Sequence, residues 1–202
     1  MLSDYTKIFA TYGIGIATIR YILYFRDIRR GTAKPHVFSW FVWGGVLSAI
    51  AAGARFAKGA GAGAWITGFV ASACLTISMI ALSQGEKDIT RSDWVCFVTA
   101  LLATVLWVIT HNPLSAVLVV TAADGLGYVP TFRKSYHDPW SEPPNGYALA
   151  TLRGVFGVLS LASFNLTTVF YPAVVMLLDG SFTIMLLIRR RQLNGSYKPN
   201  QV

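Results

Sequence analysis

The sequence predicts an all-α polytopic membrane protein with seven transmembrane helices. Of its 202 residues, 54% are hydrophobic and only 13% are charged, whereas a soluble domain carries roughly 25% charged residues. The basic residues lie in short clusters between apolar runs, and about 20 apolar residues suffice for a helix to cross a bilayer core about 30 Å thick. We therefore attribute the net charge of +8 to membrane topology, with membrane lipids and no nucleic acid as expected partners.

Seven apolar runs have the length and polarity of membrane spans. In chain order they cover 8–25, 37–55, 62–82, 92–110, 114–129, 147–165 and 168–188. The first run is expected to be retained rather than cleaved, because it contains Arg20, is followed directly by Arg26 and lacks the small-x-small pattern of a signal-peptide cleavage site. The GAGAG at 59–63 predicts a close turn and small-residue packing at the start of the third span. The links at 111–113 and 165–168 are short enough to require antiparallel neighbours.

The distribution of Lys and Arg predicts the orientation, because cytoplasmic loops are enriched in both. If the N-terminus is outside, twelve of these residues fall on the inner side and three on the outer side. The inner residues are Arg26, Arg29, Arg30, Lys34, Lys87, Arg91, Arg133, Lys134, Arg189, Arg190, Arg191 and Lys198, and the outer ones are Lys7, Arg55 and Lys58. The C-terminus is therefore predicted to be cytoplasmic. Its basic tail is interpreted as an anionic-lipid contact or as a plain stop-transfer anchor.

A shift of 104 residues superimposes two segments that end apolar runs in the same way. It places Tyr24 on Tyr128, Arg29 on Arg133, Arg30 on Lys134 and Pro35 on Pro139. Both segments follow predicted outside-to-inside helices. If a unit with an odd number of helices is repeated directly, the second copy is inverted in the membrane. One extra helix between the copies is therefore needed to give both the same orientation. We predict two parallel three-helix bundles, 1–85 and 113–190, joined by a linker helix within 86–112 and followed by a cytoplasmic tail at 191–202.

A 3+1+3 chain with proline and basic residues at the cytoplasmic ends of its first and fifth spans resembles the SWEET, PQ-loop and PnuC group of transporters. YVPTFRKSYHDPWSEP at 128–143 is similar to the proline-x-basic signature of the PQ-loop type, with Thr131 where glutamine is expected. Arg26 takes the place of Pro130 in the first repeat, the second and sixth spans contain no proline, and the sixth lacks the Trp-rich motif of a nicotinamide riboside carrier. The resemblance implies a rocking transporter with Pro130 as a hinge, but it does not identify the solute. The alternative is that Pro130 simply ends a helix.

Four charged residues fall within the predicted spans away from their ends, namely Arg20, Asp124, Arg153 and Asp179. Such a residue costs about 2.5 to 3.5 kcal/mol near the centre of a span, so all four are expected to face the bundle interior. The shift of 104 superimposes Arg20 on Asp124, which predicts one ion pair across the axis, with Arg153 and Asp179 as a second pair. Two interpretations stay open. The four residues line a solute pathway, where an aspartate could also carry a proton, or they are ion pairs that fix how the bundles dock.

Two further side chains are candidates for the same cavity. Trp43 lies deeper in the second span than Trp40 and could stack on a sugar or a flat ring, although a tryptophan belt at the membrane interface is the default interpretation. Asn165 ends the sixth span and is a candidate cap or gate group as well as a candidate ligand.

The sequence predicts neither an enzyme nor a bound cofactor or metal. It contains no GxSxG or HExxH motif and no phosphate-binding Gly-Lys loop, and the last span has no lysine for a retinal Schiff base. We therefore predict an integral protein of a bacterial-type inner (plasma) membrane that transports a small polar solute through a central site between its repeats. A sugar, a vitamin or nucleoside, and an amino-acid-like solute all remain open, as do facilitated diffusion, proton coupling and a homo-oligomer. The alternative is a non-transporting structural or regulatory membrane subunit.

Overall fold

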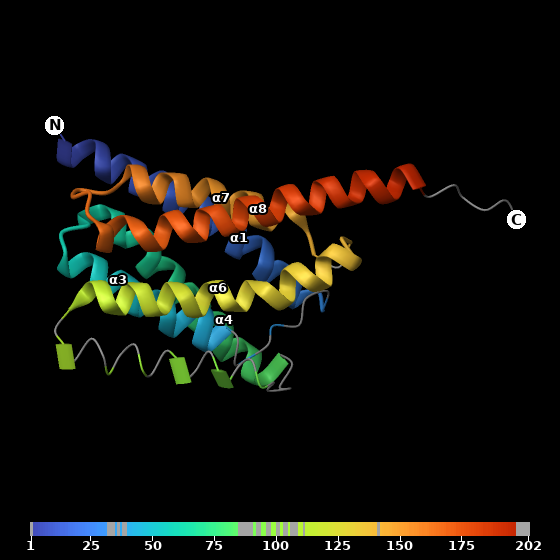
Figure 1. Ribbon diagram of the computed structural model, residues 1–202, viewed down its shortest axis with the longest axis horizontal. Helices are drawn as coiled ribbons and strands as arrows, with labels where there is room; N and C mark the ends of the chain where they lie inside the picture. Colours follow the sequence, from blue (N-terminus) through green and yellow to red (C-terminus); the bar gives the residue numbers. More distant parts are fainter. Residues whose placement is uncertain are drawn as a thin grey trace, which may run out of the picture.

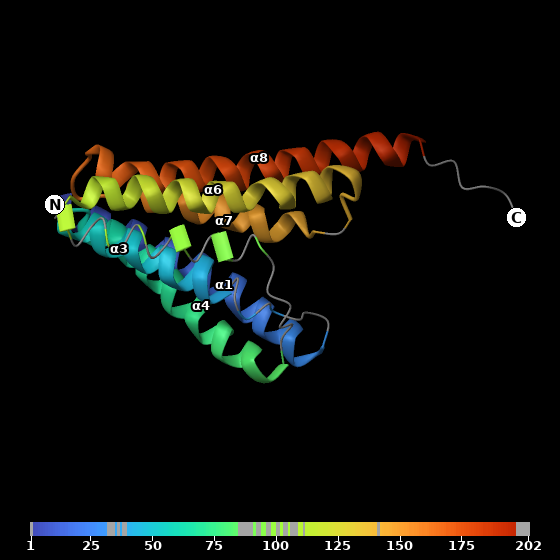
Figure 2. The ribbon, with the colours of Figure 1, turned by 60° about the horizontal axis from the view of Figure 1, so that its bottom comes forward.

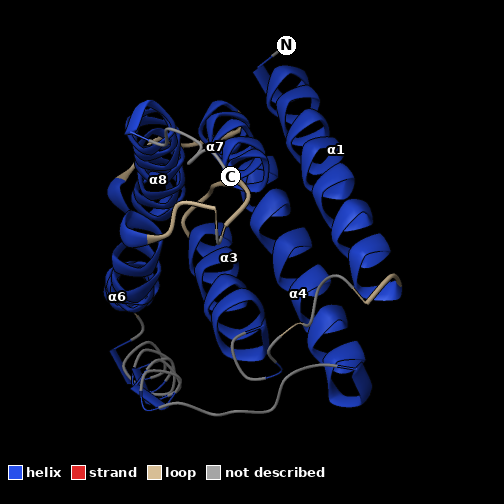
Figure 3. Ribbon diagram, turned by 90° about the vertical axis from the view of Figure 1, so that its right-hand side faces the viewer, coloured by secondary structure: helices blue, strands red, loops and turns tan. Residues whose placement is uncertain are grey.

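The computed structural model describes residues 2–31, 35, 37, 40–84, 91, 94, 95, 98, 99, 102, 105, 109, 110, 112–140 and 142–196. Within these ranges helix is the only regular secondary structure (Figure 1, Figure 3). The segments are α1 (Leu2–Arg29), the π-helical η1 (Trp40–Leu47), α3 (Ser48–Ala57), the 3-10 helix η2 (Gly61–Ala64), α4 (Trp65–Gln84), α6 (Pro113–His137), α7 (Pro144–Leu159) and α8 (Leu166–Ser196). The predicted all-α class is confirmed for this part of the chain.

Several of these helices have the length and the apolar character of membrane spans. Among the described residues four segments qualify, namely Asp4–Arg29, Gly61–Ser83, Pro113–His137 and Leu166–Leu193, while Gly44–Ala57 is apolar but shorter. Large apolar side chains also face outward, with Met79 72% and Leu177 65% exposed. Exposed apolar side chains on helices of this length are consistent with contact with a membrane. Most of the predicted fourth span, 92–110, lies outside the described residues.

Beyond differences in where the helices begin and end, three of the predicted spans differ from the structure in kind. The second predicted span is divided into η1 and α3, and the fifth continues through position 130 to the end of α6 at His137. The sixth predicted span is too long, because α7 ends at Leu159 and the chain then turns. Asn165 ends this turn as the N-cap of α8, where its Oδ1 accepts a hydrogen bond of 3.1 Å from the Thr168 amide. Hydropathy alone could not distinguish this apolar turn from a further turn of helix.

The described helices form two groups of three, and in each group the third helix in chain order lies between the other two. In the first trio, defined as α1, η1–α3 and α4, helix α4 contacts both α1 and η1–α3. In the second trio, defined as α6, α7 and α8, helix α8 contacts both α6 and α7. Helices α1, α4 and α6 all end at the same end of the molecule (Figure 1). Helix α6 begins at the opposite end, beside the start of α1. The first and fifth predicted spans therefore run in the same direction.

Contacts between the trios close the six helical elements into a ring. Helix α1 of the first trio packs on α7 of the second, and α3 of the first packs on α6 of the second. In each case the first helix of one trio packs on the second helix of the other trio. Such reciprocity is what a two-fold axis between the trios would produce.

Both trios are joined firmly at the end that carries the N-terminus. There Arg55 is fully buried and donates hydrogen bonds to the carbonyl oxygens of Gly63 and Thr168, each at 2.9 Å, and to the hydroxyl of Thr67. The side-chain amide of Asn165 donates to the Lys58 carbonyl at 3.1 Å. Toward the opposite end the trios diverge (Figure 2). The molecule is thus closed at one end by hydrogen bonds that connect α3 with the start of α8.

Small residues permit the tight packing of the first trio. The predicted close turn at GAGAG is confirmed, since Gly59 and Gly61 adopt φ values of 81° and 56° that favour glycine. At the other end of the second predicted span, η1 approaches α4 so closely that a Cβ on Gly44 would lie 2.4 Å from the sulfur of Cys74. This close approach brings η1 and α4 to the same wall of the central space.

Candidate functional site

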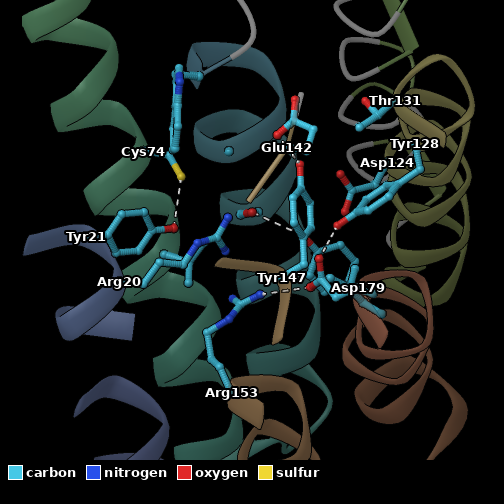
Figure 4. A pocket seen from close by; sticks show the side chains of 16 residues that line it. Arg20, Tyr21, Cys74, Asp124, Tyr128, Thr131, Glu142, Tyr147, Arg153 and Asp179 are labelled. Atoms are coloured by element: carbon cyan, nitrogen blue, oxygen red, sulfur yellow. Dashed lines mark hydrogen bonds and ion pairs between the residues drawn. The ribbon is translucent and has the colours of Figure 1, made fainter. Parts of the chain in front are cut away.

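A cavity of about 350 Å³ lies between the two trios and receives side chains from all six helical elements of the ring (Figure 4). The first trio supplies Arg20 and Tyr21 from α1, Trp40 from η1, Ser48 from α3 and Cys74 from α4. Of the candidates from the second trio, Asp124, Arg153 and Asp179 all line it. The four ionisable residues singled out from the sequence therefore meet in one cavity. Its volume lies at the small end of the roughly 300–1,000 Å³ usual for ligand pockets.

Helical spacing explains how α6 and α8 direct several polar groups to this cavity. Residues three or four apart share one face of an α-helix. Asp124, Tyr128 and Thr131 follow this spacing on α6, and all three line the cavity. On α8, Tyr171 and Asp179 are eight residues apart and line it in the same way. The polar stripe on each helix faces the cavity, while large apolar side chains such as that of Leu177 face outward.

Asp179 is the centre of a buried polar cluster within the second trio. Its Oδ1 accepts a hydrogen bond of 2.7 Å from the Tyr128 hydroxyl, and its Oδ2 lies 4.0 Å from Nη2 of Arg153. The side chains are nearly buried, with 3% of Asp179 and 14% of Arg153 exposed. The predicted Arg153–Asp179 pair is confirmed. Nε of Arg153 is buried without a hydrogen-bond partner among the described residues, so this guanidinium keeps one unused donor.

Arg20 and Asp124 face the same cavity but are not paired. Among the described residues no ion pair joins them, so the predicted pair across the axis is wrong. The guanidinium of Arg20 lies 5.9 Å from the centre of the Tyr21 ring and makes no hydrogen bond within the described part of the chain. Figure 4 shows the two side chains entering from different sides of the pocket. The space of the cavity separates them, which is the physical reason that the pair does not form.

Tyrosines and small polar groups form much of the remaining wall. The Tyr21 hydroxyl lies 3.4 Å from Sγ of Cys74, and that of Tyr171 lies 3.2 Å from the Ser48 hydroxyl. The Tyr147 hydroxyl donates to Oε2 of Glu142 at 3.2 Å. Aromatic rings with hydroxyl groups offer both apolar contact and hydrogen bonds to a small polar molecule.

Three residues predicted for the site are not placed in the cavity. Asn165 lies at the closed end, where it caps α8 and bonds to the first trio, so its interpretation as a cap is confirmed. The side chains of Trp43 and Pro130 lie outside the described residues. Because the backbone of α6 is helical through position 130, Pro130 does not end this helix. A hinge at this proline stays a prediction.

Tyr128, Tyr171 and Glu142 also line the cavity, although they were not predicted from the sequence to do so. The first two could have been found from their spacing, since each lies at a multiple of four residues from an aspartate on the same helix. Glu142 lies in the link before α7, and no helical period indicates where such a residue points. Trp40 was interpreted as part of an interfacial belt, yet it also lines the cavity.

The polar lining of the cavity consists of ionisable side chains and hydrogen-bonding hydroxyl groups. In the described part of the chain, no three His, Cys, Asp or Glu residues gather in a way that could hold a metal ion. Comparison with family models, with curated proteins and with solved structures finds no match for this chain.

Proposed function

We propose that the chain is a membrane transporter that moves a small polar solute through the cavity between two three-helix repeats. The observation that carries this proposal is the cavity itself, which lies within a ring of long apolar helices and receives charged side chains from both trios. Charge within membrane helices is costly and commonly marks the path of a solute or an ion. An integral protein of a bacterial-type inner membrane, with its C-terminus cytoplasmic, is the setting that we propose.

The arrangement of the trios supports alternating access. They are linked at one end by Arg55 and Asn165 and diverge at the other. In the orientation predicted from Lys and Arg, the linked end is the outer one. The described conformation would then hold the cavity closed to the outside, and rocking of one trio against the other would reverse this. Pro130 on α6 and Pro172 within α8 are the candidate hinges.

The alternative of a structural subunit rested on ion pairs that dock the two bundles. However, the observed pair joins Arg153 on α7 to Asp179 on α8, and both helices belong to the second trio. It therefore cannot hold one trio to the other. Docking relies instead on the apolar contacts of α3 with α6 and on the hydrogen bonds at the closed end. Because docking of the trios does not use the charged residues of the cavity, these residues are available for a solute.

Uptake by purified protein in proteoliposomes tests the proposal. A panel of radiolabelled sugars, amino acids, nucleosides and vitamins is offered with and without a pH gradient. We expect uptake of at least one solute class above that of empty liposomes, and we expect Asp179→Asn to lower it at least tenfold, because the change weakens both contacts of this carboxylate. If Asp179 carries a coupled proton, the variant also loses any stimulation by the gradient.

Asp27→Asn is the matched control, since it makes the same chemical change at an exposed position beside Arg26. Its uptake should equal that of the wild type. Failure of the wild-type protein to move any solute in the panel would favour the subunit alternative. Equal uptake by Asp179→Asn and Asp27→Asn would remove Asp179 from the pathway.

A further inference from the structure

The cavity holds one cation and one anion that have no ionic partner in the described part of the chain. Arg20 makes no ion pair and no hydrogen bond there, and Asp124 makes no ion pair. The other two charged residues, Arg153 and Asp179, form an ion pair with each other, in which Nη2 of Arg153 lies 4.0 Å from Oδ2 of Asp179. The two groups that lack an ionic partner thus differ in sign and come from different trios, although Asp124 also has a hydrogen bond with Tyr171.

The positions of these two groups relate them to each other. Arg20 lies on α1 and Asp124 on α6, at sequence positions that the shift of 104 superimposes. The two helices belong to different trios and form opposite parts of the ring, and both side chains line the same 350 Å³ cavity. In Figure 4 the guanidinium of Arg20 and the carboxylate of Asp124 enter from different sides. The cavity therefore has a positive side and a negative side.

Leaving such groups unpaired in a membrane interior is costly. A buried charge requires a partner of opposite sign or contact with water, and a charge at membrane depth costs about 2.5 to 3.5 kcal/mol on insertion scales. A solute with a single charge would satisfy only one side of the cavity, and a neutral sugar would satisfy neither by ionic contact. A small solute with both charges would satisfy both sides together.

We propose that the cavity binds a zwitterionic solute of the amino-acid type, with its carboxylate at Arg20 and its ammonium at Asp124. This inference rests on the proposed transport function for its biological role, but binding itself can be measured without transport. The guanidinium of Arg20 can form paired hydrogen bonds with a carboxylate. The tyrosine and tryptophan rings of the wall provide surfaces for an ammonium group and for an apolar side chain.

Binding to the purified wild-type protein in detergent provides the first test, by isothermal titration calorimetry and by the rise in melting temperature. The probes are the common L-amino acids, and the tightest binder is then compared with two analogues of nearly the same size. Its amide lacks the carboxylate, and its 2-hydroxy acid lacks the ammonium group. We expect each analogue to bind at least tenfold more weakly than the amino acid. Equal binding of all three ligands to the wild-type protein, or no binding of any amino acid, would overturn the proposal.

Two variants assign the charges to their partners. Arg20→Gln should reduce the preference for the amino acid over its amide, and Asp124→Asn should reduce the preference for the amino acid over its 2-hydroxy acid. Asp27→Asn should leave both preferences unchanged. Melting curves of the unliganded variants show whether they are folded. Unchanged preferences in both folded cavity variants would contradict the assignment.

The outcomes separate this inference from the transport proposal. An amino acid that binds as expected but is not taken up by proteoliposomes would support the zwitterion site and contradict transport. Uptake of a sugar or a nucleoside, with no amino acid bound, would support transport and contradict the zwitterion site.

Discussion

Replacement of Arg55 by lysine should destabilise the closed end of the molecule, because one ammonium cannot replace three separate donors. Nε, Nη1 and Nη2 of Arg55 reach acceptors on three different segments, namely α8, α4 and η2. Its side chain is fully buried, so water cannot replace a lost bond. A lysine carries its hydrogens on a single nitrogen and would retain about one of the three bonds.

The expected loss follows from these contacts. A hydrogen bond to a charged group contributes about 1.5 to 3 kcal/mol, so two lost bonds amount to about 3 to 6 kcal/mol. For a chain of this size about 1 kcal/mol corresponds to about 2 to 4 °C, and the melting temperature should fall by at least about 6 °C. Thermal unfolding of the purified protein in detergent, followed by tryptophan fluorescence, measures the shift.

Arg26→Lys is the matched control, because the Arg26 side chain is half exposed and bonds only to the adjacent Asp27 among the contacts given by the structure. Exposed pairs of this kind contribute little, so its melting temperature should stay within about 2 °C of the wild type. If Arg55→Lys melts together with this control, the three bonds do not hold the trios at this end, and the closed end must depend on apolar packing alone.

Two further predictions concern helix packing and topology. Gly44→Ala should destabilise the protein by about 1 to 3 kcal/mol, because the added Cβ would overlap the side chain of Cys74 on α4. Gly68→Ala is the control and should not destabilise it, because a Cβ there meets no atom within 4 Å. The melting temperatures of the two variants test this, and equal values would refute the close approach of η1 to α4. In a background with both native cysteines replaced by serine, single cysteines at 30 and 134 should react with an impermeant thiol reagent from the same side of the membrane, and one at 58 from the other side. Reaction of 30 and 134 from opposite sides would refute the parallel repeats.

The sequence predicted the gathering of charges because apolar helices can carry ionisable residues only where they avoid lipid. Arg20, Asp124, Arg153 and Asp179 could therefore be assigned to the interior without a structure. Their pairing could be predicted only in part. Arg153 and Asp179 lie on helices that are adjacent in the chain and pack together, whereas Arg20 and Asp124 would meet only if their helices approached the axis. The cavity occupies that space, and a residue shift alone does not reveal it.

The roles of the side chains at the closed end could not be predicted from the sequence either. Arg55 was counted with Lys58 among the three outer basic residues, because it lies at the very end of the second predicted span. Only the fold brings the carbonyl of Thr168, more than a hundred residues away, within 2.9 Å of its guanidinium. Charge counting predicts the side of the membrane for such a residue but not its burial.

The different placement of the two charge sets suggests how binding could be coupled to rocking of the trios. Arg153 and Asp179 belong to one trio, so their separation is unaffected when the trios move as rigid bodies. Arg20 and Asp124 belong to different trios, and their separation changes with that movement. A ligand shifts a conformational equilibrium only by its difference in affinity for the two states. A solute that bridges Arg20 and Asp124 would bind best at one separation of the trios, and a solute held by Asp179 and Arg153 alone would bind equally in both states. For that reason the unpaired charges, rather than the paired ones, are the groups through which a solute could drive the movement.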